Sequence, residues 1–250
     1  MICGHMRTFK NAYDNFIKTL IDPNKEHDID VYIATSSINT GRTNTHPTID
    51  PVGDITHDQK YFKGKGLIYK IDKDSLVSDI KTTYNSKDFN LKEIFLQDEK
   101  LEDNNINPKS WKWFRQGIFS KPWLCFNSIS NINQYDVIVR TRPDLILYKK
   151  IKLFDSNDIK LFGGWTGDNK YETGKYIADF FAFGNYNTMK TYCDIHLMEH
   201  PMQTTVKNHP FNSENQLTLY LASKGIKTNF VITKRRDYRI RRFKDSDRQH

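Results

Sequence analysis

The stretch that decides the fold is Tyr135-Asp-Val-Ile-Val-Arg-Thr-Arg-Pro-Asp-Leu-Ile-Leu147. Its run of β-branched residues, 137–139, predicts a strand over 136–141 that is covered on both faces, because such side chains fit a buried pleated surface. Pro143 has no backbone N–H to donate, so the strand should end before it. Ligands of open α/β sheets bind at the carboxyl ends of strands, where this chain places three charged residues. These residues are Arg140, Arg142 and Asp144.

The chemistry of these three side chains suits a phosphorylated ligand. A guanidinium group matches the geometry of phosphate, and a single carboxylate can hold a metal ion or a sugar hydroxyl. The alternative is structural: buried charges of this kind are tolerated when they pair and hydrogen-bond with each other. The stretch therefore predicts a phosphate site, with a buried Arg–Asp ion pair as the other interpretation.

Toward the N-terminus, the first 35 residues predict a strand, a helix and a second strand. Residues 1–3 form the first strand and 30–35 the second, and apolar residues at helical spacing fill 9–20 between them. This βαβ pattern favours a parallel sheet. Gly4 and Arg7 lie between strand and helix, with Thr8 as a candidate cap, so the helix N-terminus could hold a diphosphate. An ordinary glycine at a strand end is the alternative.

The rest of the chain continues the alternation of strands and helices. The loops 36–66 and 163–178 are polar and long enough to serve as lids over an acceptor. The sequence predicts one α/β domain over 1–233, Rossmann-like, with a mostly parallel central sheet flanked by helices. Further strands are expected at 67–71, 91–96, 145–148, 159–162, 179–184 and 230–233, and further helices at 75–84 (capped by Ser75), 108–132, 187–198 and 213–224.

Two more carboxylates are candidates for chemistry. Asp179 opens an apolar strand, and Glu214 stands in the first turn of a helix. Either could act as an acid or base or contact a sugar, although a helix N-terminus favours an acidic residue whatever its function. The same helix begins with the capping-box pattern Ser213-Glu-Asn-Gln216, and Gly225 stands where a glycine commonly ends a helix.

Composition narrows the classes of function. The net charge of +8 is concentrated near the end, where 234–244 carries seven cations and one anion. We expect 234–250 to be a solvated basic tail, with contact to phosphate, to a membrane surface or to nucleic acid as alternatives. The three cysteines are far apart, which argues against a disulfide framework and for a reducing compartment. Without an apolar run of about 20 residues or a signal-peptide pattern, a soluble cytoplasmic protein is expected.

Several segments together resemble a group of small glycosyltransferase-like proteins of the GT-A type, which occur in bacteria and in large DNA viruses. The matching pieces cover nearly the whole chain, and the Arg-x-Arg-Pro-Asp piece is the most specific. The pieces are Gly4-His-Met-Arg-Thr-Phe9, Trp113-Phe-Arg-Gln116, Tyr135 to Leu145, Asp179-Phe-Phe-Ala-Phe-Gly184 with Met189 following, and Ser213-Glu-Asn-Gln216.

The resemblance implies a GT-A-like fold and an enzyme that moves a sugar from a nucleotide-diphosphate sugar to a hydroxyl of a glycan or protein acceptor, in the cytoplasm of a bacterium or host cell or in a virion. It places Gly4, His5 and Arg7 against the nucleotide. Arg140, Arg142 and Asp144 handle the diphosphate, and Asp179 or Glu214 acts on the sugars, one as general base.

Such enzymes often hold Mn²⁺ or Mg²⁺ with an Asp-x-Asp motif, but here Asp144 is the only carboxylate at that position, so a metal-free arginine clamp is the alternative. A non-catalytic module that binds a glycan or an anion is the chief rival to the enzyme. A nucleic-acid-binding protein is less favoured, since only the basic tail points to it.

Overall fold

The structure is a computed structural model that describes residues 1–6, 8–41, 60–62, 66–70, 72–97, 115–154, 159–163, 177–202, 213–232 and 238–240. The chain forms two compact units. The N-terminal unit comprises Ile2–Asn104, Arg142–Lys152 and Tyr238–His250, and the central unit comprises Met1, Asn105–Thr141 and Leu153–Asp237. The boundary between Thr141 and Arg142 divides the Arg-x-Arg-Pro-Asp sequence. The division into 1–233 and a tail stays a prediction.

The predicted βαβ beginning is confirmed in the N-terminal unit. Strands β1, β2 and β6 are parallel neighbours in the order β1-β2-β6, and Ile2 of β1 pairs with Ile33 of β2. Helix α1 connects the first two strands and continues into a π turn and a 3-10 turn at Pro23, where the sequence predicted its end. The bounds are β1 Ile2–Cys3, α1 Phe9–Phe16, β2 Asp30–Ser36, α2 Lys73–Thr83 and β6 Asn90–Gln97.

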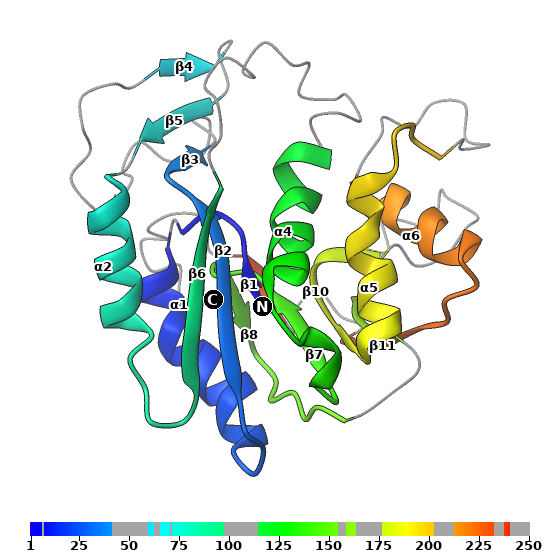
Figure 1. The fold of residues 1–250 in the computed structure, drawn as a ribbon, viewed down its shortest axis with the longest axis horizontal. Coiled ribbons are helices and arrows are strands. Elements are labelled where there is room, and N and C mark those ends of the chain that lie inside the picture. Colours follow the sequence, from blue (N-terminus) through cyan, green and yellow to red (C-terminus); the bar gives the residue numbers. More distant parts are fainter. Residues whose placement is uncertain are drawn as a thin grey trace. The chain divides into compact units, whose positions relative to one another are not determined.

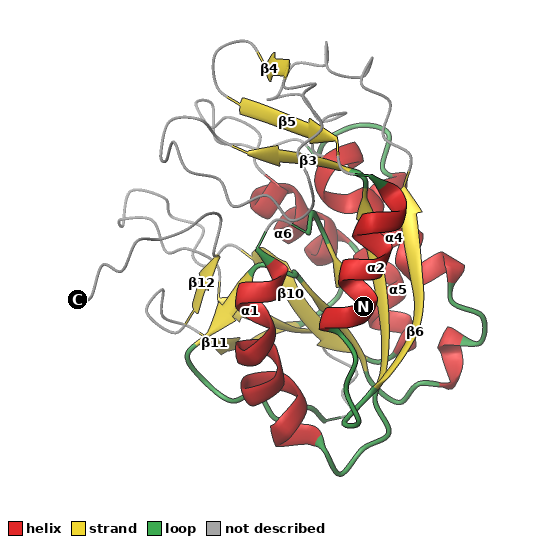
Figure 2. Ribbon diagram, turned by 90° about the vertical axis from the view of Figure 1, so that its left-hand side faces the viewer, coloured by secondary structure: helices red, strands yellow, loops and turns green. Residues whose placement is uncertain are grey.

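Helices α1 and α2 bury their apolar faces against these strands, and both face the viewer in Figure 2. Phe9 of α1, Ile33 of β2 and Ile80 of α2 are fully buried in one cluster. Tyr84 closes the cluster at the end of α2, with its ring stacked on Phe9 at 6.1 Å and edge-on to Tyr13 at 5.3 Å. Aromatic rings thus supply much of the buried area that the low apolar content of the chain would otherwise lack.

Both predicted helix caps of this unit differ from the structure. Thr8 precedes α1, but its side chain makes no capping hydrogen bond. Asp72, rather than Ser75, caps α2: its carboxylate accepts the backbone N–H of Ser75 at 2.8 Å. An aspartate just before the first helical residue satisfies an N–H that the helix itself leaves without a partner, and Ser75 already lies inside the helix.

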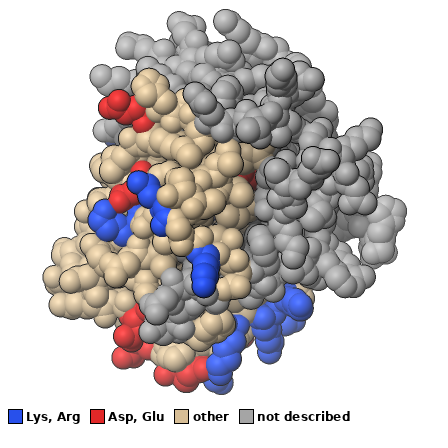
Figure 3. Space-filling view, turned by 90° about the vertical axis from the view of Figure 1, so that its right-hand side faces the viewer, with Lys and Arg blue, Asp and Glu red and all other residues tan. Residues whose placement is uncertain are grey.

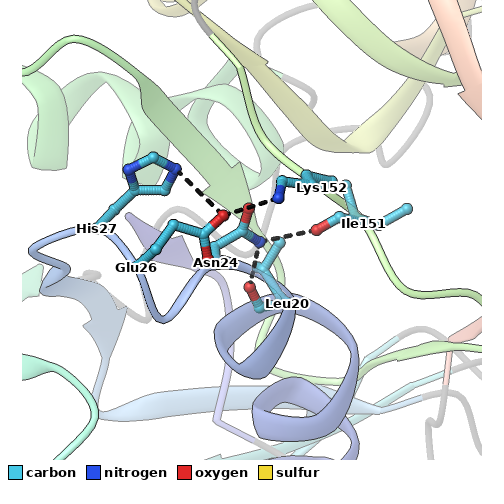
Figure 4. Close-up of polar contacts among 6 residues, drawn as sticks. All are labelled: Leu20, Asn24, Glu26, His27, Ile151 and Lys152. Carbon is cyan, nitrogen blue, oxygen red and sulfur yellow. Dashed lines mark hydrogen bonds and ion pairs between the residues drawn. The ribbon is translucent and has the colours of Figure 1, made fainter.

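The segment that follows Arg142 is bound along α1. The side-chain amide of Asn15 donates to the Leu147 carbonyl at 2.8 Å and accepts the Leu147 N–H at 2.7 Å. Asn24 donates to the carbonyl oxygens of Leu20 at 2.7 Å and Ile151 at 2.8 Å, and Lys152 pairs with Glu26 at 2.9 Å (Figure 4). Side-chain amides therefore replace strand partners here and fix residues 147–152 to the end of α1.

The predicted basic tail contains a strand. β12 (Tyr238–Ile240) pairs antiparallel with β8 (Leu145–Leu147), so three residues of the segment 234–250 are ordered in a two-stranded sheet. The rest of that segment lies outside the described residues, as does Arg7.

The predicted loop 36–66 also contains strands. β3 (Ile38–Gly41) and β4 (Lys60–Phe62) both pair antiparallel with β5 (Gly66–Lys70), in the order β3-β5-β4. The polar composition of this segment concealed them, because a strand of three or four residues offers little alternation to detect.

The central unit is a mixed sheet covered by helices. Its strand order is β11-β9-β10-β7, with β10 antiparallel to both of its neighbours and β11 parallel to β9. Helices α5 and α6 pack on β10, α4 packs on α5, and α4 and α5 lie in front of the strands in Figure 1. The bounds are α4 Ser120–Ser128, β7 Ile138–Thr141, β9 Ile159–Gly163, β10 Ile177–Gly184, α5 Tyr186–Asp194, α6 Ser213–Ser223 and β11 Thr228–Ile232.

The ends of α6 confirm one prediction and correct another. Gly225 ends the helix in the left-handed region at φ 69°, and the N–H of Ile226 bonds the Leu221 carbonyl at 3.0 Å, as the C-terminal glycine predicted. Gln216 does not complete a capping box. Its side chain is fully buried and binds Met202 instead, accepting the N–H at 2.7 Å and donating to the carbonyl at 3.3 Å.

The fold class predicted from the sequence is confirmed at the level of α/β. The pairings β1-β2, β2-β6 and β9-β11 are parallel, β10 is antiparallel to β7 and β9, and helices flank these strands, which is consistent with a mixed, mostly parallel Rossmann-like fold. None of the helices in the described ranges has the length and apolar character needed to cross a bilayer.

Candidate functional site

The residues that the sequence singled out divide between the two units. Gly4, His5, Arg142 and Asp144 belong to the N-terminal unit, and Arg140, Asp179 and Glu214 belong to the central unit. Within each unit, contacts that the sequence alone does not reveal connect some of these residues.

In the N-terminal unit, Gly4 meets Pro143. Gly4 has φ +150°, and a Cβ at this position would lie 3.1 Å from Cδ of Pro143, tighter than nearly all real contacts. A glycine is thus required by the packing of the loop after β1 against the Arg-Pro-Asp segment. The piece that begins at Gly4 is therefore in contact with the Arg-x-Arg-Pro-Asp piece, the most specific part of the resemblance.

Arg142 and Asp144 form a buried, two-pronged ion pair. Nε and Nη2 of Arg142 each donate to one carboxylate oxygen of Asp144 at 2.7 Å, and Asp144 is 0% exposed. This geometry is the strongest that an arginine and a carboxylate can adopt. It is the structural interpretation that the sequence left open for these two residues.

The pair does not fit the metal role predicted for Asp144. Both carboxylate oxygens already accept from Arg142, and a guanidinium cation at this distance repels a second cation. Within the described ranges no three His, Cys, Asp or Glu side chains are grouped to hold a metal ion. The divalent cation stays a prediction.

His5 lies at the carboxyl ends of β1 and β2. Its Nδ1 is 3.4 Å from the hydroxyl of Ser36, the last residue of β2, and the imidazole is half-buried. His5, which the sequence predicted to contact the nucleotide, thus lies beside a hydroxyl group. Arg7 of the same motif is outside the described residues.

In the central unit, strand pairing brings Arg140 and Asp179 to the same edge of the sheet. Thr141, which ends β7, pairs with Phe181 of the antiparallel β10, and Arg140 pairs with Ala182. The carboxyl end of β7 therefore lies beside the amino end of β10, where Asp179 stands. The sequence predicted a ligand-binding edge at the end of β7, and this pairing adds Asp179 to it.

Arg140 is buried, and two of its donor groups have no acceptor among the described residues. Its side chain is 3% exposed, and its Nε and Nη1 have no hydrogen-bond partner among the residues that the structure describes. An arginine that loses water without gaining acceptors costs stability, because each buried donor left unsatisfied carries a desolvation penalty. Such a side chain is expected where the missing acceptor belongs to a bound ligand, and guanidinium geometry suits a phosphate group.

Glu214 and Asp179 interact electrostatically. Partial burial of Glu214 on α6 and, to a smaller extent, the nearby charge of Asp179 together raise the pKa of its carboxyl from 4.5 to about 7. Asp179 itself is 8% exposed, and its backbone carbonyl accepts the hydroxyl of Tyr192 from α5 at 3.3 Å. A carboxyl that is half-ionised near pH 7 is suited to accept or donate a proton.

Two residues that hold this pair were missed by sequence reasoning. Tyr192 supports the Asp179 backbone, and Thr218 joins the start of β10 to α6. The sequence did contain a signal for the contact between Thr218 and Glu214. Thr218 stands four residues after Glu214, and the hydroxyl of a helical threonine commonly donates to the carbonyl of residue i−4.

The surface shown in Figure 3 bears on the nucleic-acid alternative. On the described part of this face, Lys and Arg side chains occur in small groups, separated from one another by neutral and acidic residues. A continuous basic surface, which nucleic-acid binding favours, is not present on that described part.

Searches with protein family models and with curated protein sequences found no match to this chain.

Proposed function

We propose that this chain is a glycosyltransferase that moves a sugar from a nucleotide-diphosphate sugar to an acceptor hydroxyl, using a GT-A-like fold. The observation that carries the proposal is Arg140, a buried guanidinium with two N–H groups lacking a partner among the described residues, at the carboxyl end of β7. A diphosphate supplies the acceptors that these groups lack. The resemblance of the Arg-x-Arg-Pro-Asp sequence to this family supports the same assignment.

In the proposed reaction, the acceptor oxygen bonds to the anomeric carbon of the sugar while the bond from that carbon to the diphosphate oxygen breaks. The electron pair of the broken bond stays on the diphosphate, and Arg140 stabilises this charge. The acceptor hydroxyl gives its proton to the ionised carboxyl of Glu214. Asp179 makes Glu214 a stronger base because its negative charge favours the protonated product.

The two arginines take different roles in this proposal. Arg142 is already neutralised by Asp144, so it maintains the loop next to Gly4 rather than clamping the diphosphate. The nucleotide contacts of Gly4 and His5 stay a prediction for the N-terminal unit, where both residues stand at the carboxyl ends of parallel strands.

The test is a thermal-shift screen of nucleotide-diphosphate sugars against wild type and Arg140→Met, each with and without Mn²⁺ or Mg²⁺. We expect one class of donor to stabilise the wild type, by roughly 2.7 kcal/mol at 100 times its Kd. Arg140→Met should abolish that shift, whereas Lys149→Ala, which removes an exposed cation, should keep it. A donor shift that survives Arg140→Met contradicts the assignment of Arg140.

Turnover is measured separately, as nucleoside diphosphate released in the presence of mono- and oligosaccharide acceptors. We expect the rate to rise with pH up to about 7, because only the ionised form of Glu214 accepts a proton. A rate that falls over this pH range contradicts the role of Glu214 as the base.

One observation favours a second function, a non-catalytic module that binds a glycan or an anion. Asp144, the carboxylate at the usual metal position of the family, is engaged by Arg142. The two functions differ in outcome: a binding module is stabilised by a donor or a glycan but releases no nucleoside diphosphate with any acceptor.

A further inference from the structure

Thr218 makes two hydrogen bonds that join two elements of the central unit. Its hydroxyl accepts the backbone N–H of Ile177 at 2.9 Å and donates to the backbone carbonyl of Glu214 at 2.7 Å. Ile177 is the first residue of β10, and Glu214 lies in the first turn of α6. One hydroxyl group thus connects the residue that begins the strand of Asp179 with the residue that carries the proposed base.

Two other helical threonines, Thr191 and Thr82, show the hydrogen bond to the carbonyl of residue i−4 without the bond to a strand. Thr191 on α5 donates to the carbonyl of Asn187 at 3.1 Å, and Thr82 on α2 donates to that of Ser78 at 2.9 Å. Neither bond reaches a second element. The second bond, to a strand N–H, distinguishes Thr218 and gives it a matched control in Thr191.

Two further side chains, those of Tyr192 and Gln216, hold the backbone near Asp179 and the start of α6. Tyr192 on α5 donates to the Asp179 carbonyl at 3.3 Å, and Gln216 on α6 binds both backbone groups of Met202. The first turns of α6 are therefore held at two places, by Gln216 and by Thr218. Of these two, only Thr218 is bonded to β10, the strand that bears Asp179.

We propose that Thr218 is a positioning residue, whose hydroxyl holds the first turn of α6 against the start of β10 and thereby sets how closely Glu214 approaches Asp179 and how far it is removed from water. This inference rests on the proposed function, in which Glu214 accepts the proton of the acceptor. It adds a residue that touches neither sugar nor nucleotide and acts through the two carboxylates.

Loss of the Thr218 hydroxyl should change the surroundings of Glu214. The N–H of Ile177 then needs a new partner, and water that reaches it also solvates the start of α6. Asp179 on β10 is the charged group that acts on Glu214, and no described charged side chain of α5 or α6 does so. Better solvation and a longer distance from Asp179 both favour the ionised carboxyl, so the pKa of Glu214 should fall.

The test compares wild type with Thr218→Val, which keeps the shape without the hydroxyl, Thr218→Ser, which keeps the hydroxyl, and Thr191→Val. Hydrogen exchange of the Ile177 amide reports the bond, and an NMR titration of the Glu214 side-chain carboxyl reports its consequence. In Thr218→Val we expect Ile177 to exchange about tenfold faster and the Glu214 midpoint to fall by about one unit. Thr218→Ser and Thr191→Val should match wild type in both.

Two results would overturn the inference. Unchanged exchange of Ile177 in Thr218→Val means that the bond does not hold the strand, and faster exchange with an unchanged Glu214 midpoint means that it does not position the base. Thr218→Ala provides the same comparison if Thr218→Val does not fold. Neither readout measures sugar transfer, so a shifted midpoint in a protein without turnover refutes the proposed function alone.

Discussion

Arg140 and Arg142 stand two residues apart, yet the structure uses them in opposite ways. In the N-terminal unit, Arg142 donates two N–H groups to the carboxylate of Asp144, each at 2.7 Å. Arg140, at 3% exposure in the central unit, keeps Nε and Nη1 without a partner among the described residues. A single motif therefore contains one arginine that is paired with a carboxylate and one with two buried donors that lack an acceptor among the described residues.

The largest expected effect tests the paired arginine. Arg142→Ala removes the paired cation and two hydrogen bonds from the buried carboxylate of Asp144, so we expect the free energy of unfolding to fall by about 3–5 kcal/mol, measured by urea denaturation. Lys10→Ala removes one side of the exposed Lys10–Asp79 pair, at 2.8 Å, and should cost about 1 kcal/mol or less.

A double-mutant cycle sharpens this result. Arg142→Ala combined with Asp144→Asn should be more stable than Arg142→Ala alone, because the buried charge has been removed. Equal stability of the single and double variants would show that the pair is not a structural unit.

The second effect tests the arginine without a partner. Arg140→Met removes buried donors that lack acceptors, so the stability of the ligand-free protein should stay equal or rise. Turnover should fall on the order of 10²–10³-fold, because the charge that stabilises the leaving diphosphate is lost. A large loss of stability in the ligand-free Arg140→Met would mean that Arg140, like Arg142, is structural.

A third prediction concerns the dependence of stability on pH in the central unit. Burial and the nearby charge of Asp179 raise the pKa of Glu214 from 4.5 to about 7, so the folded protein retains this proton over a range where the unfolded chain has released it. Stability should therefore fall as pH rises from about 4.5 to 7, by on the order of 3 kcal/mol for this group. Glu214→Gln should lack this part of the pH dependence.

The measurement for Glu214 is the difference in unfolding free energy between wild type and Glu214→Gln at a series of pH values. Glu93→Gln removes an exposed carboxyl on β6 and controls for the loss of a negative charge. A difference that does not change between pH 4.5 and 7 would contradict the raised pKa of Glu214.

The smallest effect separates the two causes that act on Glu214. Asp179→Asn removes the nearby charge but leaves the burial, which is the larger cause. The pKa of Glu214 should fall and still remain above 4.5, as seen in an NMR titration of its carboxyl. A midpoint at the ordinary value would mean that the charge of Asp179, rather than burial, dominates.

The sequence predicted the regular elements well because their signals are local. The β-branched run before Pro143 placed β7, and the stripe from Phe9 to Leu20 placed α1. Gly225 marked the end of α6, since a left-handed residue after a helix favours glycine. Each of these predictions depends on residues that are neighbours in the chain.

The site was predicted less completely because its contacts are between distant residues. The residues Gly4, Arg140, Asp179 and Glu214 were all chosen from local patterns, but the packing of Pro143 on Gly4 joins positions far apart in the chain. The capping-box pattern failed at Gln216 because Met202, fourteen residues away, offered two backbone groups to its amide. Local spacing identifies candidate polar side chains, but it does not predict which distant residue each of them binds.

The discontinuity of the N-terminal unit has a consequence for the order in which the protein is made. Strand β8 packs on α1, where Asn15 and Leu147 are separated by 132 positions in the sequence, and pairs with β12, which follows the whole of Leu153–Asp237. During synthesis, α1 and the strands around it leave the ribosome long before β8 and β12, which complete the contacts of this unit, have been made. The central unit is fully translated first, and the unit that begins the chain is the last that can finish folding.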